Sequence, residues 1–407
     1  MRTGFLIAFL IATPLLLVGC VSMALPRVPV RLTAPAAAPA LDGTGLASWE
    51  TGRDALRQRF ADEIYGEAPA DRPARIVAHE LIEAQAFGGL GRIEQYTLDL
   101  SGFETHLVVI LPNAATAPVP TIILQMFCGN RTALGGREDI APPPPEAHAP
   151  QCDGSIQNVP VRMIFGRYIM EPPVTDILAH GHAIALIYPG DIVPDDADAA
   201  AARLAALVPD RPSGAIAAWA WVYSRVVDVL DGDARFDADR TAVWGHSRNG
   251  KAALLAGAVD ERIDLVIAHQ AGTGGTALTR SGTGESVEAI TSGYPHWFAP
   301  AFAGRASHRA DMPIDQHQLI ALLAPRPLLI GGAWRDQWSD PQSSFRAAEG
   351  ANPVYHLYGS DGLTQPGLDE FNPAADIAVA MRPGLHGVQP QDWENFLAFL
   401  DAHFATP

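Results

Sequence analysis

Positive charge and cysteine are both scarce in this sequence. The 407 residues include 28 lysines and arginines against 45 acidic residues, a net charge of −17, and only 3 cysteines. A nucleic-acid-binding protein needs a basic surface, so this charge balance argues against nucleic acid as a partner. The sequence also has no HExxH motif and no paired CxxC motifs. We therefore expect neither a catalytic metal nor another cofactor.

Charged residues are few as well, at 18%, whereas hydrophobic residues make up 48% of the chain. This composition excludes disorder of the whole chain and supplies material for a large core. The 37 glycines and 34 prolines suit a globular protein rich in loops, and they argue against a coiled coil or a helical repeat.

The chain begins with an apolar segment that has the features of an export signal. Arg2 provides a positive start, and residues 5–18 are apolar apart from Thr13 and Pro14. The segment is too short for a comfortable membrane span, but it has the length of a signal-peptide core.

The signal segment ends in Leu-Val-Gly-Cys, with the cysteine at position 20. This ending resembles the lipobox of bacterial lipoproteins. It predicts a lipoprotein signal peptide at residues 1–19, lipidation of Cys20 and an alanine- and proline-rich tether at residues 20–45. Val21 is not the Asp that would resemble an inner-membrane retention signal, so a periplasmic or outer-membrane-anchored lipoprotein of a Gram-negative bacterium is favoured. The alternative is an ordinary secretory signal with an incidental cysteine.

Export leaves one even pair of cysteines in the mature chain. Cys128 and Cys152 stand on either side of a proline-rich loop at residues 142–145. In an oxidising compartment such a pair can form a disulfide. Two unrelated buried thiols are the alternative.

From residue 46 to residue 407, strand-like and helix-like segments alternate. The predicted strands are residues 106–111, 121–126, 182–188, 240–244, 264–269, 326–330 and 354–358. The predicted helices are residues 216–230, 250–259, 341–349 and 393–404. Short apolar strands that alternate with helices predict a mostly parallel sheet covered on both faces. We expect a single domain of the three-layer α/β class.

The most informative motif follows the predicted strand at residues 240–244. Gly245-His-Ser-Arg-Asn-Gly250 leads directly into a helix-like run. A serine on a tight turn between strand and helix is typical of the nucleophile elbow of the α/β-hydrolase fold. Ser247 is the candidate nucleophile, and the backbone N–H of Arg248 is the expected first oxyanion donor. The motif departs from G-x-S-x-G because Asn249 delays the second glycine by one residue.

A serine nucleophile needs a base and an acid, which follow it in the chain order Ser, Asp or Glu, His in this fold. Asp336 lies in the loop after the predicted strand at residues 326–330, with Asp340 as the alternative acid. His386, flanked by glycines before the last helix, is the candidate base.

Other histidines compete for the role of base. His180 and His182 stand at a helix-to-strand junction and are expected to be structural. His246 is expected to point into the sheet or its packing, and His317 to begin a buried helix.

The stretch Gly245-His-Ser-Arg-Asn-Gly-Lys251 resembles the G-x-S-R-x-G-K signature of the glucuronoyl esterases, carbohydrate esterase family 15. An Arg directly after the nucleophile and a Lys four residues after it are uncommon among esterases at large. Further similar stretches are residues 126–132, 188–192, 295–297, 315–317, 322–327, 384–387 and 392–393. The likeness runs from about residue 50 to the C-terminus.

The resemblance implies a role for each matching residue. Ser247 corresponds to the nucleophile and His386 to the general base. Arg248 corresponds to the arginine whose side chain joins the oxyanion hole, and Lys251 to the lysine that binds hydroxyls of the uronic acid ring.

Two further residues correspond to substrate contacts. Glu285 resembles an acceptor for sugar hydroxyls in bacterial members, and Trp338 resembles a tryptophan that contacts the ring. The alternatives are a solvated loop carboxylate and a core aromatic, respectively.

One position departs from the family pattern. Many members carry the triad acid as a Glu after the strand that follows the nucleophile helix, and this chain has Gln270 there. An amide cannot stabilise an imidazolium as a carboxylate does. Some bacterial relatives have the acid later in the chain, and Asp336 fits that place.

The resemblance implies a serine esterase that acts on esters of 4-O-methylglucuronic acid, such as those between xylan and lignin alcohols, through an acyl-enzyme. We expect a monomer that contacts the membrane only through its lipid. The first alternative is an acetyl xylan esterase or general carboxylesterase of the same fold. The second is a lipoprotein that binds carbohydrate without hydrolysing it.

Overall fold

The computed structural model describes residues 45–147, 152, 162, 164–281 and 283–405. The predicted signal peptide, the lipidation site at Cys20 and all but the last residue of the predicted tether lie outside these residues.

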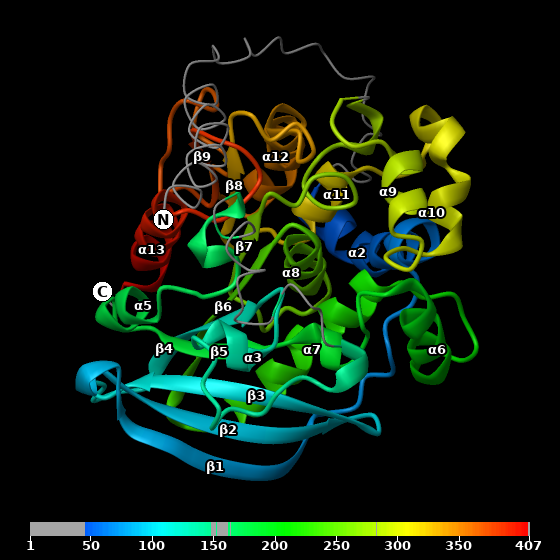
Figure 1. Ribbon diagram of the computed structural model, residues 1–407. Helices are drawn as coiled ribbons and strands as arrows, with labels where there is room; N and C mark the ends of the chain where they lie inside the picture. Colours follow the sequence, from blue (N-terminus) through cyan, green and yellow to red (C-terminus); the bar gives the residue numbers. More distant parts are fainter. Residues whose placement is uncertain (1–44, 148–151, 153–161, 163, 282, 406–407) are drawn as a thin grey trace, which may run out of the picture.

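In the described part of the chain, nine strands form one sheet in the order β1-β2-β3-β5-β4-β6-β7-β8-β9 (Figure 1). The strands are β1 (Arg75–Ala86), β2 (Gly91–Leu100), β3 (Phe103–Pro112), β4 (Val119–Gln125), β5 (Ala183–Ile187), β6 (Phe236–His246), β7 (Leu265–His269), β8 (Leu328–Ala333) and β9 (Ile377–Arg382). Antiparallel pairing joins β1, β2, β3 and β5, and every pair from β5 to β9 is parallel. The predicted α/β-hydrolase class, with its mostly parallel sheet, is confirmed.

Helices cover both faces of this sheet. The α-helices are α2 (Leu46–Phe60), α3 (Asn130–Ala133), α5 (Val174–Ala179), α6 (Ala197–Leu207), α7 (Ala215–Asp231), α8 (Arg248–Val259), α9 (Val287–Gly293), α10 (Pro300–Gly304), α11 (Gln316–Ala321), α12 (Pro341–Leu357) and α13 (Pro390–Phe404). A π-helical turn at Ala61–Tyr65 follows α2. Short 3₁₀ turns lie at Phe87–Gly89, Pro145–Ala147, Arg167–Ile169, Pro189–Asp191, Thr279–Ser281 and Ala306–Asp311.

Two hydrophobic cores flank the sheet, one on each face. Ile123 of β4 packs into the core shared with α2, α7, α8, α11 and α12. Its neighbours Ile122 and Leu124 pack into the other core, with α5 and α13. Successive side chains of a strand point to opposite faces, so a sheet covered on both faces needs continuously apolar strands. This requirement explains the apolar runs in the sequence.

One predicted strand is wrong. Residues 354–358 form the end of α12, and the last strand is β9, which lies further along the chain. Val354 and Tyr355 are buried in the same core as Ala347, Ala348 and Ala351, which gives the three- and four-residue spacing of a helical face. A short apolar run after a proline reads equally well as a strand, and Pro353 stands inside the helix.

The structure joins Cys128 and Cys152 in a disulfide. Cys128 follows β4, and the bond ties the segment after that strand to a residue 24 positions further along the chain. Both cysteines are buried and line the same cavity as Ser247.

Candidate active site

Ser247 stands on a strained turn between β6 and α8. Its backbone has φ +56° and ψ −120°, which is rare for a residue other than glycine, and its N–H donates to the carbonyl of His269 at 2.8 Å. A Cβ atom at Gly245 would lie 2.1 Å from the carbonyl oxygen of Asn249, and one at Gly250 would lie 2.9 Å from that of Gly245. The turn therefore requires glycine at both positions, including the delayed one.

Helix α8 begins directly after Ser247. Arg248 is the first residue of α8, so its backbone N–H has no partner within the helix and is available to an oxyanion. Asn249 is buried and its amide donates to the carbonyl of Gln125, at the end of β4, at 3.1 Å. This bond fixes the start of the helix against the sheet.

Asp336 and His386, the predicted acid and base, are in direct contact. The Asp336 Oδ2 atom lies 2.7 Å from Nδ1 of His386, and it also accepts a hydrogen bond from the Ser339 hydroxyl at 2.5 Å. Burial alone would raise the pKa of Asp336, but the bonds and charge of His386 and the bonds from Ser339 lower it below its ordinary value. A carboxylate that stays ionised here can orient and stabilise an imidazolium.

Asp340 has a different environment from Asp336. Its carboxylate caps α12 by accepting the N–H of Ser343 at 3.1 Å, and it accepts hydrogen bonds from Ser281 and Thr283. The carboxylate that contacts His386 is therefore that of Asp336.

The Arg248 side chain is held at the cavity wall by an acid and by aromatic rings. Its guanidinium lies 3.2 Å from Oδ2 of Asp195 and 4.3 Å from the centre of the Phe127 ring. Burial alone would raise the pKa of Asp195, but the charge of Arg248 and bonds from His296 and Trp297 lower it to about 2. Asp195 thus remains charged and orients the guanidinium.

Lys251 is buried one helical turn after Ser247. Its ammonium donates to the carbonyl of Ala271 and, at 2.7 Å, to that of Thr273. Burial lowers its pKa to about 8, opposed by the charges of Glu285 and Asp336. Burial likewise raises the pKa of Glu285, opposed by Lys251. Since an ammonium has three donors and two are used by carbonyls, one remains for a ligand.

These side chains line one cavity of about 430 Å³. Its polar lining consists of His246, Ser247, Arg248, Lys251, Gln270, Glu285, Ser339 and His386. Its apolar and aromatic lining includes Phe127, Phe165, Ile169, Met170, Tyr294, Trp297 and Trp338. The cavity beside Ser247 thus offers both polar groups and apolar surface.

Trp338 and Glu285 meet at the edge of this cavity. Trp338 is 61% exposed, and its ring stands edge-on to His386 with 5.8 Å between ring centres. The Glu285 N–H donates to the Trp338 carbonyl at 3.4 Å. Trp338 is thus not a core aromatic, and Glu285 is only partly exposed.

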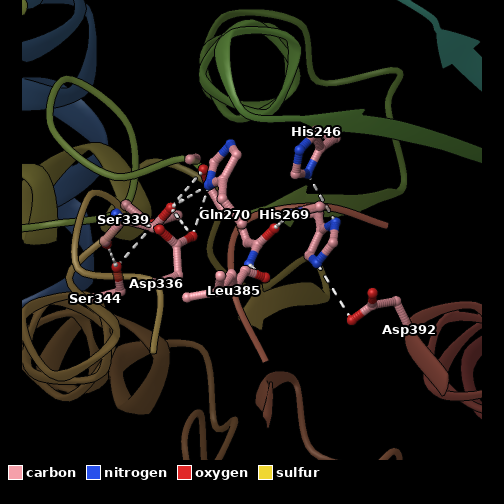
Figure 2. A network of polar contacts seen from close by, with 12 residues as sticks. His246, His269, Gln270, Asp336, Ser339, Ser344, Leu385 and Asp392 are labelled. Carbon is pink, nitrogen blue, oxygen red and sulfur yellow. Dashed lines mark hydrogen bonds and ion pairs between the residues drawn. The ribbon is translucent and has the colours of Figure 1, made fainter. Parts of the chain in front are cut away.

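The four histidines named above as rival candidates for the base divide into two groups. His180 and His182 both contact Asp401 of α13, and His317 lies in α11, as expected. The prediction for His246 is incomplete, because this buried ring also lines the cavity, 4.7 Å from the ring centre of His386. Its Nδ1 atom lies 3.1 Å from that of His269 (Figure 2).

Among the described residues, no cluster of His, Cys, Asp or Glu side chains is suited to hold a metal ion. Within the same residues, no helix has both the length and the apolar character needed to cross a membrane.

The sequence did not predict the contacts that three residues make in the site. Ser339 contacts Asp336, Asp195 contacts Arg248, and the Gln270 side chain contacts the loop that carries His386. For Asp195, the only available signal was an acidic residue just beyond the stretch 188–192 that carries part of the family resemblance. The sequence contained no comparable signal for the roles of Ser339 and Gln270.

The chain is similar to several known proteins. Residues 206–359 match a family model described as glucuronyl esterase, fungi. A carbohydrate esterase of an unknown prokaryotic organism is 34% identical over 380 residues, which cover 89% of this chain and 88% of that protein. A 4-O-methyl-glucuronoyl methylesterase of Hypocrea jecorina is 36% identical over 156 residues, which cover 36% of this chain and 34% of that protein.

A solved structure shows the same likeness in three dimensions. A glucuronoyl esterase from Solibacter usitatus superimposes with a TM-score of 0.77 at 32% identity. The match covers 91% of this chain and 98% of that chain.

Replacement of the acid should separate the two candidate aspartates. Asp336→Asn should lower kcat roughly 10³- to 10⁴-fold, because the amide cannot stabilise the imidazolium. Asp340→Asn should leave kcat within about threefold of the wild type, because Asn also caps helices well. Steady-state hydrolysis of one ester by both variants is the measurement. A large loss of kcat in Asp340→Asn alone would contradict the assignment.

Proposed function

Since this chain belongs to the glucuronoyl esterase family, a family of carboxylic ester hydrolases, we propose that Ser247 attacks esters of 4-O-methylglucuronic acid. The observation that carries the proposal is the position of Lys251, which lines the same cavity as Ser247 and His386. Lys251 is the only lysine in the 407 residues. A buried ammonium with a spare donor suits a hydroxylated sugar ring better than a simple acyl group.

The proposed reaction proceeds through an acyl-enzyme. His386 takes the proton of the Ser247 hydroxyl as its oxygen attacks the C6 carbonyl of the uronate. The oxyanion accepts hydrogen bonds from the backbone N–H and from the guanidinium of Arg248, which is always charged. The alcohol leaves with the proton from His386, and water, activated by the same imidazole, then releases the uronic acid.

Lys251, Glu285 and Trp338 bind the sugar in this proposal. Charge-assisted hydrogen bonds from Lys251 and to Glu285 hold ring hydroxyls, and the exposed Trp338 ring contacts the sugar face. These contacts fix the ester carbon relative to Ser247, which is how binding energy accelerates an acyl transfer.

We propose that the alcohol contacts apolar side chains that line the cavity. Phe127, Phe165, Ile169 and Met170 are among the lining residues, and apolar surface suits an aromatic alcohol better than a second sugar. In plant biomass this substrate is the ester between xylan-borne glucuronate and lignin alcohols.

We further propose that the protein works as a monomeric lipoprotein, anchored through Cys20 at the outer membrane of a Gram-negative cell. The Leu-Val-Gly-Cys ending of the signal segment supports the anchor. The disulfide between Cys128 and Cys152 supports export to an oxidising compartment.

The first test compares two esters. The wild type should hydrolyse a benzyl or methyl glucuronate ester with a kcat/KM at least about tenfold above that for an acetylated xyloside, because only the uronate can use Lys251 and Glu285. Ser247→Ala should abolish both activities. A preference for the acetate would replace the proposal with an acetyl esterase. Failure of a fluorophosphonate probe to label Ser247 would favour a binding protein without hydrolase activity.

The Lys251 pKa of about 8 predicts pH-dependent binding. The spare donor is present below pH 8 and is lost as the pH rises through that value, so KM for the uronate ester should increase above pH 8. Lys251→Met should raise KM about tenfold at pH 7 and remove this alkaline increase. KM for an acetate ester, measured over the same range, is the control and should stay constant. A parallel increase for both esters would contradict the role of Lys251.

The anchor is tested by Cys20→Ala. Wild type should fractionate with membranes and carry the mass of a lipid at its N-terminus, whereas Cys20→Ala should be found in the soluble fraction. An unmodified N-terminal mass in the wild type would refute the anchor and leave an ordinary secretory signal.

A further inference from the structure

The loop that carries His386 has no regular secondary structure. It runs from Pro383 to Gln389 between β9 and α13, and its two glycines have φ of +112° at Gly384 and +148° at Gly387. Groups from outside the loop therefore satisfy its backbone polar groups: the N–H of Arg335 donates to the carbonyl of Gly384, and the carbonyl of Phe165 accepts the N–H of Val388. Arg382 donates to the carbonyls of Pro383, Leu385 and Gly387.

The second side chain that binds this loop is Gln270, directly after β7. Gln270 is 2% exposed and has a left-handed backbone, with φ +48°. Its N–H donates to the carbonyl of Gly331 in β8 at 2.8 Å. This bond holds the Gln270 backbone against the sheet, and the side chain extends from there to the loop.

Both ends of the Gln270 amide contact the loop. Oε1 accepts the N–H of Gly387 at 2.8 Å, and Nε2 lies 3.4 Å from the carbonyl of Leu385 (Figure 2). These are the two residues on either side of His386 in the chain. The Gln270 amide thus bridges the two chain neighbours of His386.

The Gln270 backbone also contacts the acid side of the site. Its carbonyl accepts the Ser339 hydroxyl at 3.0 Å, and the same hydroxyl lies 2.5 Å from Oδ2 of Asp336 (Figure 2). One residue therefore contacts both the loop of the base and the serine that supports the acid.

We propose that Gln270 is a positioning residue that sets the orientation of the His386 imidazole by bridging its two chain neighbours. The proposal rests on the proposed role of His386 as the general base. The position requires an amide, because the carboxylate of a Glu could accept from Gly387 but could not donate to the Leu385 carbonyl. Gln270 acts on the rate through His386, without contact to the reacting atoms.

Gln270→Met tests the proposal with a side chain of similar length and no hydrogen bonds. Since both bonds to the loop are lost, kcat should fall about 10- to 100-fold, with KM within about twofold of the wild type. The rate of Ser247 labelling by a fluorophosphonate should fall in parallel. This second readout needs no ester, so a wrong sugar specificity would leave it unaffected.

Gln365→Met is the matched control. Gln365 is also a buried glutamine whose amide bridges backbone groups, since Oε1 accepts the N–H of Val379 at 2.8 Å and Nε2 donates to the Val379 carbonyl at 3.0 Å. It does not line the cavity with Ser247. This variant should lower the unfolding midpoint while the kcat of the folded fraction stays near that of the wild type.

Gln270→Glu provides a pH signature that a merely structural role would not produce. A protonated carboxyl can donate to the Leu385 carbonyl, and an ionised one repels it. The ratio of kcat between Gln270→Glu and wild type should be about 0.1 at pH 8 and should rise toward 1 as the pH falls through the pKa of the introduced carboxyl. This isosteric variant keeps the test available if Gln270→Met fails to fold.

Three results would overturn the proposal. The first is a wild-type kcat and labelling rate in Gln270→Met. The second is a loss confined to KM, which would make Gln270 a substrate contact. The third is a pH-independent ratio for Gln270→Glu. By contrast, failure of the wild type on uronate esters, with normal labelling of Ser247, would refute the proposed substrate and leave this inference standing.

Discussion

The hydrogen bond between His386 and Asp336 joins the proposed base to the proposed acid, and it matters because His386 stands on a loop without regular secondary structure. The four strands β6, β7, β8 and β9 are adjacent and parallel, so their carboxyl ends lie along one edge of the sheet. Ser247, Gln270 and Asp336 follow the first three of these strands, and His386 follows the last. The sheet fixes where each loop starts, and the bond at 2.7 Å fixes how the last two loops meet.

The two cations of the site are stabilised in different ways, and the difference has a chemical consequence. Arg248 is paired with the Asp195 carboxylate, and a guanidinium keeps its proton throughout the accessible pH range. Lys251 is held mainly by neutral carbonyls, and burial lowers its pKa to about 8. The proposed oxyanion partner therefore keeps its charge, whereas the proposed sugar contact loses its charge as the pH rises. Alkaline loss of activity should begin with binding.

The sequence predicted the parts of the site that depend on neighbouring residues. The turn at Ser247 is local, since strand, glycines and helix stand within one short motif, and chain order then placed Asp336 and His386. The C-terminal half of α12 was predicted as a strand, because Val354 and Tyr355 after a proline suit either structure and only packing decides. The last strand, β9, was missed because the predicted strand at residues 354–358 was taken as the last one.

The contacts of Gln270 show why the other parts of the site could not be predicted from the sequence. Its side-chain partners lie 115 and 117 positions along the chain, and its backbone partner Ser339 lies 69 positions away. Sequence reasoning established what an amide at this position cannot do, namely carry the charge of a triad acid. What it contacts instead depends on how the loops after β7, β8 and β9 converge, and no local pattern encodes that convergence.

The buried His246 limits the number of positive charges next to His386. His246 is fully buried beside His386, and burial, with the positive charges of His386 and His269, lowers its pKa well below the ordinary value. His246 therefore stays neutral when His386 becomes an imidazolium, and the two rings, with centres 4.7 Å apart, do not repel each other as ions. Behind it, Asp392 contacts both His269 and Arg382, so that its carboxylate balances the guanidinium that holds the His386 loop. Asp336 is the carboxylate in direct contact with His386, the proposed base.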